Sequence, residues 1–186
     1  MGRPRGSSDS SFRAKRVILP ALCLLLAAGA PVPHGADPKD AEAVIAKFKE
    51  KDPALAKVFA SARGYAVYPT VGKGAIGIGG AHGKGYVYQG GKLIGTSSLT
   101  QVTIGLQLGG QSYSEVVFLK DAAALENFKK GKLKLDAQAS AIALTARAAA
   151  DLAYRDGVAI VTMAKGGLMY EASVGGQKFS YKATGS

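Results

Sequence analysis

The chain has 186 residues, of which 24 are Lys or Arg and 13 are Asp or Glu, so its formal net charge is +11. This length predicts one domain with its own core, and an apolar content of 47% argues against disorder. A single Cys excludes a disulfide framework and a thiolate metal site, and the 25 glycines lack the three-residue period of collagen.

Residues 1–36 have the pattern of a secretory signal peptide. Five cations precede an uncharged run over residues 17–32, and a basic start followed by a short apolar stretch is typical of export signals. At ~1.5 Å per residue this run reaches roughly 24 Å, less than the ~30 Å that a membrane-spanning helix must cross. We expect cleavage between residues 27 and 37, leaving one domain at 37–186 in the periplasm or envelope. A retained membrane anchor is the alternative.

Two short amphipathic helices are predicted after the leader. Asp37-Pro38 and Asp52-Pro53 each combine an acidic N-cap with Pro at the first helical position. An apolar stripe follows at helical spacing, and it consists of Val44, Ile45, Phe48, Leu55, Val58 and Phe59. Such a stripe is usually the core face of a helix, and a membrane-inserting face is the alternative.

From Gly64 onward, glycines alternate with apolar and β-branched residues. Fourteen of the 47 residues from 64 to 110 are Gly, and no Asp or Glu occurs over residues 64–114. This pattern predicts closely covered antiparallel strands joined by tight turns, with Gly90-Gly91 as the clearest hairpin. Glycines inside the strands are expected where another part of the backbone comes close.

The C-terminal half is predicted to continue the sheet around one short helix. Asp121 caps that helix at 122–130, and Gly131 ends it. Residues 137–153 are rich in Ala, which favours a helix, but their strand-like alternation favours a strand. Further strands are expected at 114–119, 158–161 and 168–170, with a turn at 175–176. The expected fold is α+β, with N-terminal amphipathic helices packed on a compact, barrel-like antiparallel sheet.

The sequence carries no specific catalytic or cofactor-binding motif. Residues 72–77 match the dinucleotide pattern G-x-G-x-x-G, but the Gly-rich run after them cannot form the required helix, and no acid appears before Glu115. His82 has no acid within 29 residues on either side, so we expect a solvated side chain and not a general base. We therefore expect a non-enzymatic protein without metal or cofactor, although a carboxylate pair formed only by the fold stays open.

The densest positive charge surrounds the end of the predicted internal helix. Its simplest explanation is a helix C-terminus whose dipole favours cations, and the functional alternative is a site for anionic headgroups. No recognition helix or aromatic stacking motif accompanies the charge, so nucleic acid is not an expected partner. The candidate lipid-binding residues are Lys73, Lys84, Lys120, Lys129, Lys130, Lys132 and Lys134, with Phe48 and Phe59 from the apolar stripe.

Four short motifs occur in a characteristic order: GYAVYP at 64–69, the glycine run through 79–85, GLQLGGQ at 105–111 and KGGL at 165–168. This order resembles the SYLF domain family in its exported bacterial form, over roughly Ala41 to Tyr181. The resemblance implies an α+β domain that binds envelope lipid without known catalysis. Eukaryotic members bind phosphoinositide membranes and, in some cases, actin filaments.

One departure limits what this resemblance implies. The lipid-binding helix of the eukaryotic members is described as basic, whereas residues 37–63 carry six cations and five acids. We therefore do not expect the phosphoinositide role here, nor actin outside the cytoplasm. The expected partner is an anionic phospholipid or membrane surface, bound by basic side chains plus an apolar helix face or a pocket among the strands. A structural envelope component that binds protein or polysaccharide is the alternative.

Overall fold

The computed structural model describes residues 37–76, 78–104, 109–133, 135, 140–165 and 171–184, together with Gly2. The chain from Pro33 onward forms one compact unit. The expected strand at 168–170 and the predicted lipid-binding residue Lys134 lie outside the described residues.

Two helices open the described chain as the capping signals predict. α1 (Pro38–Lys51) begins with a capping box, in which the Asp37 carboxylate accepts a hydrogen bond from the Lys39 amide at 2.9 Å. α2 (Leu55–Ser61) starts slightly later than expected. Asp52 and Pro53 form the turn before α2, and the Asp52 carboxylate accepts a bond from the Ala54 amide at 3.0 Å.

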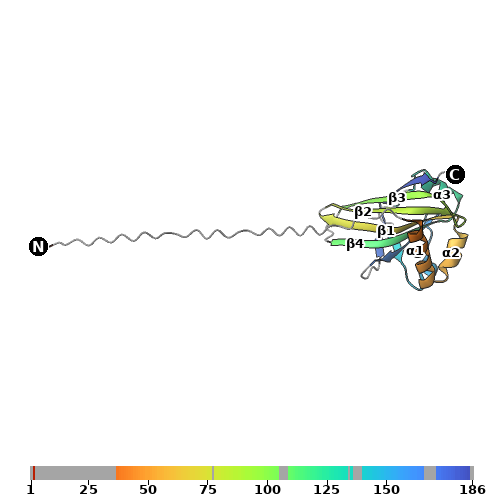
Figure 1. Cartoon of the computed structure of the whole chain (residues 1–186), viewed down its shortest axis with the longest axis horizontal. Helices are drawn as coiled ribbons and strands as arrows, with labels where there is room; N and C mark the ends of the chain where they lie inside the picture. Colours follow the sequence, from red (N-terminus) through yellow and green to blue (C-terminus); the bar gives the residue numbers. More distant parts are fainter. Residues whose placement is uncertain are drawn as a thin grey trace. The chain divides into compact units, whose positions relative to one another are not determined.

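The described strands form one open sheet in the order β7-β5-β6-β4-β1-β2-β3-β8. Figure 1 shows the neighbouring strands β4, β1, β2 and β3 of this sheet. Neighbouring strands are antiparallel except β5 and β6, which are parallel. The α+β class is confirmed, but the sheet does not close into a barrel. The strands are β1 (Gly64–Ile76), β2 (Ile78–Gln89), β3 (Lys92–Ile104), β4 (Gly109–Leu119), β5 (Ser140–Ala143), β6 (Val158–Ala164), β7 (Glu171–Ser173) and β8 (Lys178–Ala183).

Glycines form the tightest parts of this sheet. Gly90 and Gly91 have φ angles of 56° and 76°, and they join β2 to β3 in the predicted two-residue hairpin. A Cβ atom on Gly85 would lie 2.5 Å from the Val67 carbonyl oxygen and 2.6 Å from the Tyr68 ring. The expected close backbone approach therefore occurs at Gly85.

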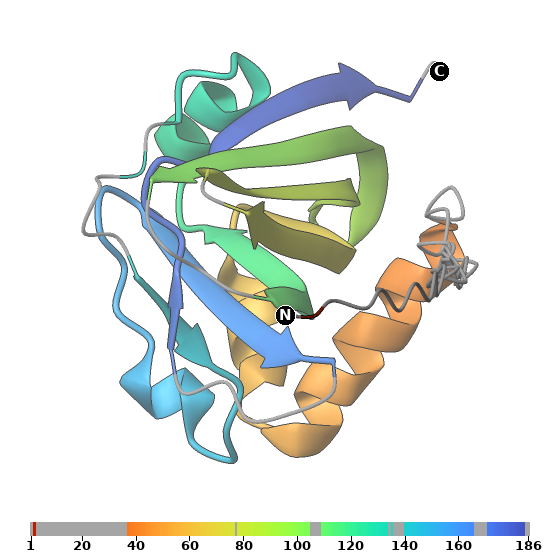
Figure 2. The same ribbon diagram turned by 90° about the vertical axis from the view of Figure 1, so that its left-hand side faces the viewer.

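The sheet separates two cores. On its inner face, α3 (Ala122–Lys129) packs against the curved strands (Figure 2). The Phe128 ring of α3 lies 5.4 Å from the Phe179 ring of β8. On its outer face, α1, α2 and the short α4 (Ala148–Asp151) cover part of the sheet. The ambiguous segment 137–153 thus contains both a strand, β5, and a helix, α4, where one element was expected.

Candidate functional site

Three neighbouring strands, β2, β3 and β8, present a polar patch on the outer face of the sheet. Strand register places these side chains in two parallel rows, each crossing all three strands. Because side chains alternate between faces, the intervening Leu99 and Phe179 point into the inner core. The two rows are Lys84, Ser98 and Ser180, followed by Tyr86, Thr96 and Lys182. We call these six residues the lysine–hydroxyl patch.

The patch lines a groove of about 410 Å³, with the backbone around Gly85 and Ser97 completing the lining. Lys84, Ser180 and Lys182 are exposed, while Thr96 and Ser98 are half-buried. The Ser98 and Ser180 hydroxyl oxygens lie 2.6 Å apart. Within the described part of the chain, the ammonium groups of Lys84 and Lys182 have no hydrogen-bond or ion-pair partner. The groove therefore has two uncompensated cations on either side of the hydroxyl groups of Ser98, Ser180 and Thr96.

Two carboxylates at the start of α1 act on Tyr86, which lines one side of the groove. Burial, together with the Asp37 and Asp40 carboxylates, raises the pKa of Tyr86 above its ordinary value of 10.0. Tyr86 is therefore a neutral phenol at physiological pH. No Asp or Glu is among the described residues that line the groove.

Basic residues continue beyond the patch in two directions. The next row on the outer face contains His82, Thr100 and Lys178, which are all exposed. In the turn after α3, a Cβ atom on Gly131 would lie 3.3 Å from the carbonyl oxygen of Phe179, so this turn lies directly against β8. The exposed Lys130 and Lys132 flank Gly131. The fold therefore places part of the predicted lysine cluster beside the strand that carries Lys182.

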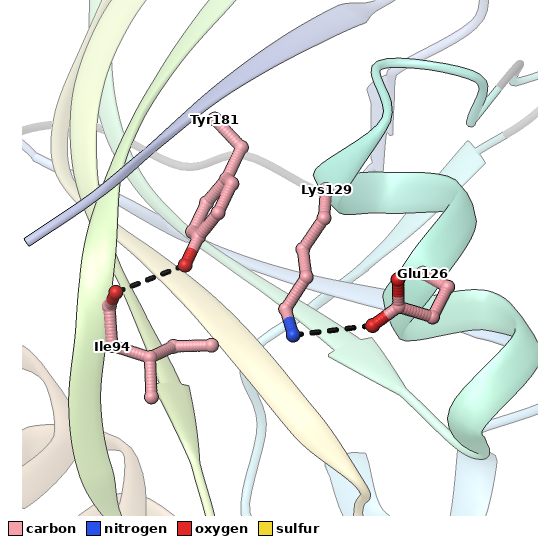
Figure 3. A network of polar contacts seen from close by, with 4 residues as sticks. All are labelled: Ile94, Glu126, Lys129 and Tyr181. Atoms are coloured by element: carbon pink, nitrogen blue, oxygen red, sulfur yellow. Dashed lines mark hydrogen bonds and ion pairs between the residues drawn. The ribbon is translucent and has the colours of Figure 1, made fainter.

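Lys129 differs from its neighbours because it has an acidic partner. Its ammonium group donates to the Glu126 carboxylate at 3.2 Å, one turn earlier on α3 (Figure 3). On the nearby edge strand, the Tyr181 hydroxyl donates to the Ile94 carbonyl at 2.9 Å and fastens β8 to β3 (Figure 3). The charge of Lys129 is partly compensated, and the position of β8 is fixed.

Two other predicted lysines lie apart from this surface. The Lys120 ammonium lies 5.8 Å from the centre of the Tyr154 ring, and the Lys120 amide bonds to the Gly157 carbonyl. Lys73 pairs in register with Ala81, whose side chain belongs to the inner core. The structure thus brings Lys84 into the groove and Lys130 and Lys132 beside β8, but it does not bring Lys73 or Lys120 there.

Phe48 and Phe59 lie in the core between the helices and the outer face. Phe48 is 0% exposed and Phe59 is 6% exposed. The Phe59 ring makes edge-to-face contacts with Tyr65 and Phe118 at centroid distances of 5.0 and 4.9 Å. Contact between these two phenylalanines and lipid stays a prediction, and it would require α1 and α2 to leave the sheet.

Sequence reasoning missed Lys178 and Lys182 of β8 and the buried Glu115 of β4. The lysines alternate with Phe179 and Tyr181, a period of two that predicts an edge strand with one polar face.

Glu115 is 0% exposed, and its carboxylate accepts a hydrogen bond from the Gln177 amide nitrogen at 3.1 Å. Burial raises the pKa of Glu115 to about 7, although the bond from Gln177 lowers it.

The described residues contain no group of three or more His, Cys, Asp or Glu side chains arranged to hold a metal ion. Among the described helices, none has both the length and the apolar composition needed to cross a bilayer.

A protein-family model matches the C-terminal part of the chain. Residues 100–184 match the family model Ysc84, described as "Las17-binding protein actin regulator". No curated protein matches the chain. The matched segment contains β8 and the α3 turn, and so includes Lys130, Lys132, Lys178 and Lys182. Over residues 100–184, just under half of its length, the chain is therefore similar to the Ysc84, or SYLF, domain family.

Proposed function

We propose that this chain is a non-enzymatic protein of the cell envelope that binds anionic phospholipid. The observation that carries the proposal is the groove on the outer face, where Lys84 and Lys182 flank hydroxyl groups and the described lining holds no acid. Lipid phosphates accept hydrogen bonds from both ammonium and hydroxyl groups, and bonds to charged groups are the stronger ones. The leader pattern supports export, and the family supports lipid as the partner.

The wider basic surface adds long-range attraction. Each lysine near an anionic bilayer contributes ~1 kcal/mol of binding free energy. Lys178 lies on the same face of β8 as the groove and is exposed, so a membrane in contact with the groove can meet a third cation there. Lys130 and Lys132 are exposed beside β8. The name of the family model refers to actin regulation, but an exported chain would not meet actin, and we propose lipid alone.

Two features support a role without catalysis. His82 is exposed on β2. Glu115 is buried beside Gln177, and no second carboxylate is among the groups that shift its pKa. General acid–base chemistry needs a positioned donor and acceptor that a substrate can reach. The exposed position of His82 and the burial of Glu115 support the proposal of a role without catalysis.

The test is vesicle sedimentation with protein purified from cells that express the full chain. We expect binding to vesicles of phosphatidylcholine mixed with phosphatidylglycerol, and weaker binding to phosphatidylcholine alone. Salt at ~1 M shortens the screening length to about 3 Å and should release the protein. Equal binding to neutral and anionic vesicles would contradict the proposal. Absence of vesicle binding together with a co-purifying envelope protein would favour the structural alternative.

A further inference from the structure

We infer that the groove of the lysine–hydroxyl patch selects a phosphomonoester, a headgroup phosphate that carries close to two negative charges, over a singly charged phosphodiester. The inference rests on the proposed function and names the chemical class of headgroup that the groove would take. It follows from the number of charges and donors that the strand register brings together.

Spacing supports one shared phosphate between the two lysines. Neighbouring strands lie ~4.8 Å apart and successive side chains on one face ~7 Å apart, so the Lys84 and Lys182 backbones are roughly 12 Å apart across the diagonal of the patch. Each lysine side chain extends several ångströms from the sheet, and both can converge above Ser98 and Thr96. A groove of about 410 Å³ lies within the ~300–1,000 Å³ range of small-molecule sites.

The hydroxyl groups supply the remaining contacts. The hydroxyl oxygens of Ser98 and Ser180 are 2.6 Å apart, so one hydroxyl donates a hydrogen bond to the other. The hydroxyl that accepts this bond still has its own hydrogen, which it can donate to a ligand in the groove. Thr96 lies in the neighbouring row on the same face, between Tyr86 and Lys182. Two ammonium groups balance the charge of a phosphomonoester dianion, whereas a phosphodiester leaves one of them uncompensated.

The position of the groove in the fold keeps it open to a membrane. Its two lysines and Ser180 are exposed, and α1 and α2 pack on the neighbouring part of the same face, which reaches the groove only at Tyr86 of β2. The Asp37 and Asp40 carboxylates of α1 act on Tyr86, at the β2 end of its row. They therefore disfavour an anion beside Tyr86 and favour one between Lys84, Lys182 and the serine hydroxyls.

The test compares vesicles that contain phosphatidic acid, a phosphomonoester, with vesicles that contain phosphatidylglycerol, a phosphodiester, at matched surface charge. The unmodified protein should bind the phosphatidic acid vesicles more tightly. The double variant Lys84→Gln/Lys182→Gln should lose about 30-fold in affinity for phosphatidic acid and lose the preference. A second variant, Ser98→Ala/Ser180→Ala, keeps the charge and should weaken the preference by several-fold.

The matched control is Lys39→Gln/Lys57→Gln, which removes two exposed lysines from α1 and α2. It should reduce binding to both kinds of vesicle equally and leave the preference unchanged. All variants alter exposed or half-buried side chains, and unchanged melting temperatures check that they fold. Equal binding of the unmodified protein to both anionic vesicles would overturn the inference while the proposed function stands. Binding to neither would overturn the proposed function itself.

A second arm separates membrane lipid from soluble phosphate. Glycerol 3-phosphate is titrated while the backbone amide signals of Ser98 and Ser180 are followed by NMR. Signal changes that vanish in the Lys84→Gln/Lys182→Gln variant support the phosphomonoester site with a soluble source of ligand. Preference for phosphatidic acid vesicles without such changes supports the same site with a lipid source. A groove variant that keeps its full preference for phosphatidic acid overturns the inference from either source.

Discussion

Glu115 is a carboxyl group in the inner core of the sheet, surrounded by Tyr113, Tyr68 and Gln177. Its Oε2 atom accepts a bond from Gln177, and within the described residues its Oε1 atom has no hydrogen-bond partner. Removing a charged carboxylate from water is costly, so burial favours the protonated form. The negative charge of Glu115 in turn helps to raise the pKa of Tyr113 above its ordinary value, after burial as the larger cause.

The pKa of Glu115, raised from 4.5 to about 7, makes folding stability depend on pH. Between these values the folded chain keeps a proton that the unfolded chain releases. The free energy of unfolding should therefore be highest below about pH 4.5 and fall by about 3 kcal/mol as pH rises through 7. Urea denaturation at about pH 5 and about pH 8 measures this fall. Glu115→Gln should remove most of it, whereas Glu126→Gln on the exposed surface of α3 should not. An unchanged pH dependence in Glu115→Gln would contradict the assignment.

At the scale of elements, Asp52 connects three helices. Its Oδ1 atom accepts a bond from the Ala54 amide at 3.0 Å, at the corner between α1 and α2. Its Oδ2 atom accepts a bond from the Ala149 amide at 2.7 Å, in the first turn of α4. Asp52 is only 3% exposed. One buried carboxylate therefore satisfies backbone donors from segments that are distant in sequence.

Replacement of Asp52 with Ala should lower the free energy of unfolding by about 2–4 kcal/mol, because two amide groups lose a charged acceptor, one of them in a buried setting. Chemical denaturation followed by circular dichroism measures the loss. Asp40→Ala removes an acceptor from an exposed capping box and should cost only about 0.5–1 kcal/mol. A similar decrease in the free energy of unfolding for Asp52→Ala and Asp40→Ala would show that the hydrogen bond from Asp52 to α4 does not stabilise the fold.

At the scale of the whole unit, the outer face is divided between two environments. α1 and α2 cover the part of the sheet that includes Val116 and Phe118. The part formed by β2, β3 and β8 carries the groove. Membrane contact through the groove leaves Phe48 and Phe59 in the core, whereas insertion of the helices would expose a large apolar surface of the sheet. The folded arrangement favours contact through the groove.

Hydrogen–deuterium exchange with and without anionic vesicles distinguishes the two modes. Contact through the groove should leave amide protection in α1 and α2 unchanged and should reduce exchange in β8, an edge strand of the sheet. Detachment of the helices should instead increase exchange over residues 38–61 when vesicles are added. That second result would restore the apolar helix face as the lipid-binding element.

Much of the local structure was predictable because it depends on residues close together in the chain. The capping box at Asp37 and the hairpin at Gly90-Gly91 use backbone preferences that a few neighbouring residues determine. The helix at 122–129 follows from its Asp121 cap in the same way. The segment 137–153 was harder, because its Ala-rich sequence suits both β5 and α4, and packing on different parts of the sheet decides between them.

The sequence by itself determined the class of the fold, its capped helices and turns, and an excess of positive charge. Only the tertiary structure decided which cations lie near one another. Lys84 and Lys182 lie on β2 and β8, and β3 between them fixes their register, while Lys73 and Lys120 are directed elsewhere. Burial of Glu115 likewise depends on Gln177, far along the chain. Strand register and burial arise from contacts between distant segments, and residue spacing alone does not encode which of those segments meet.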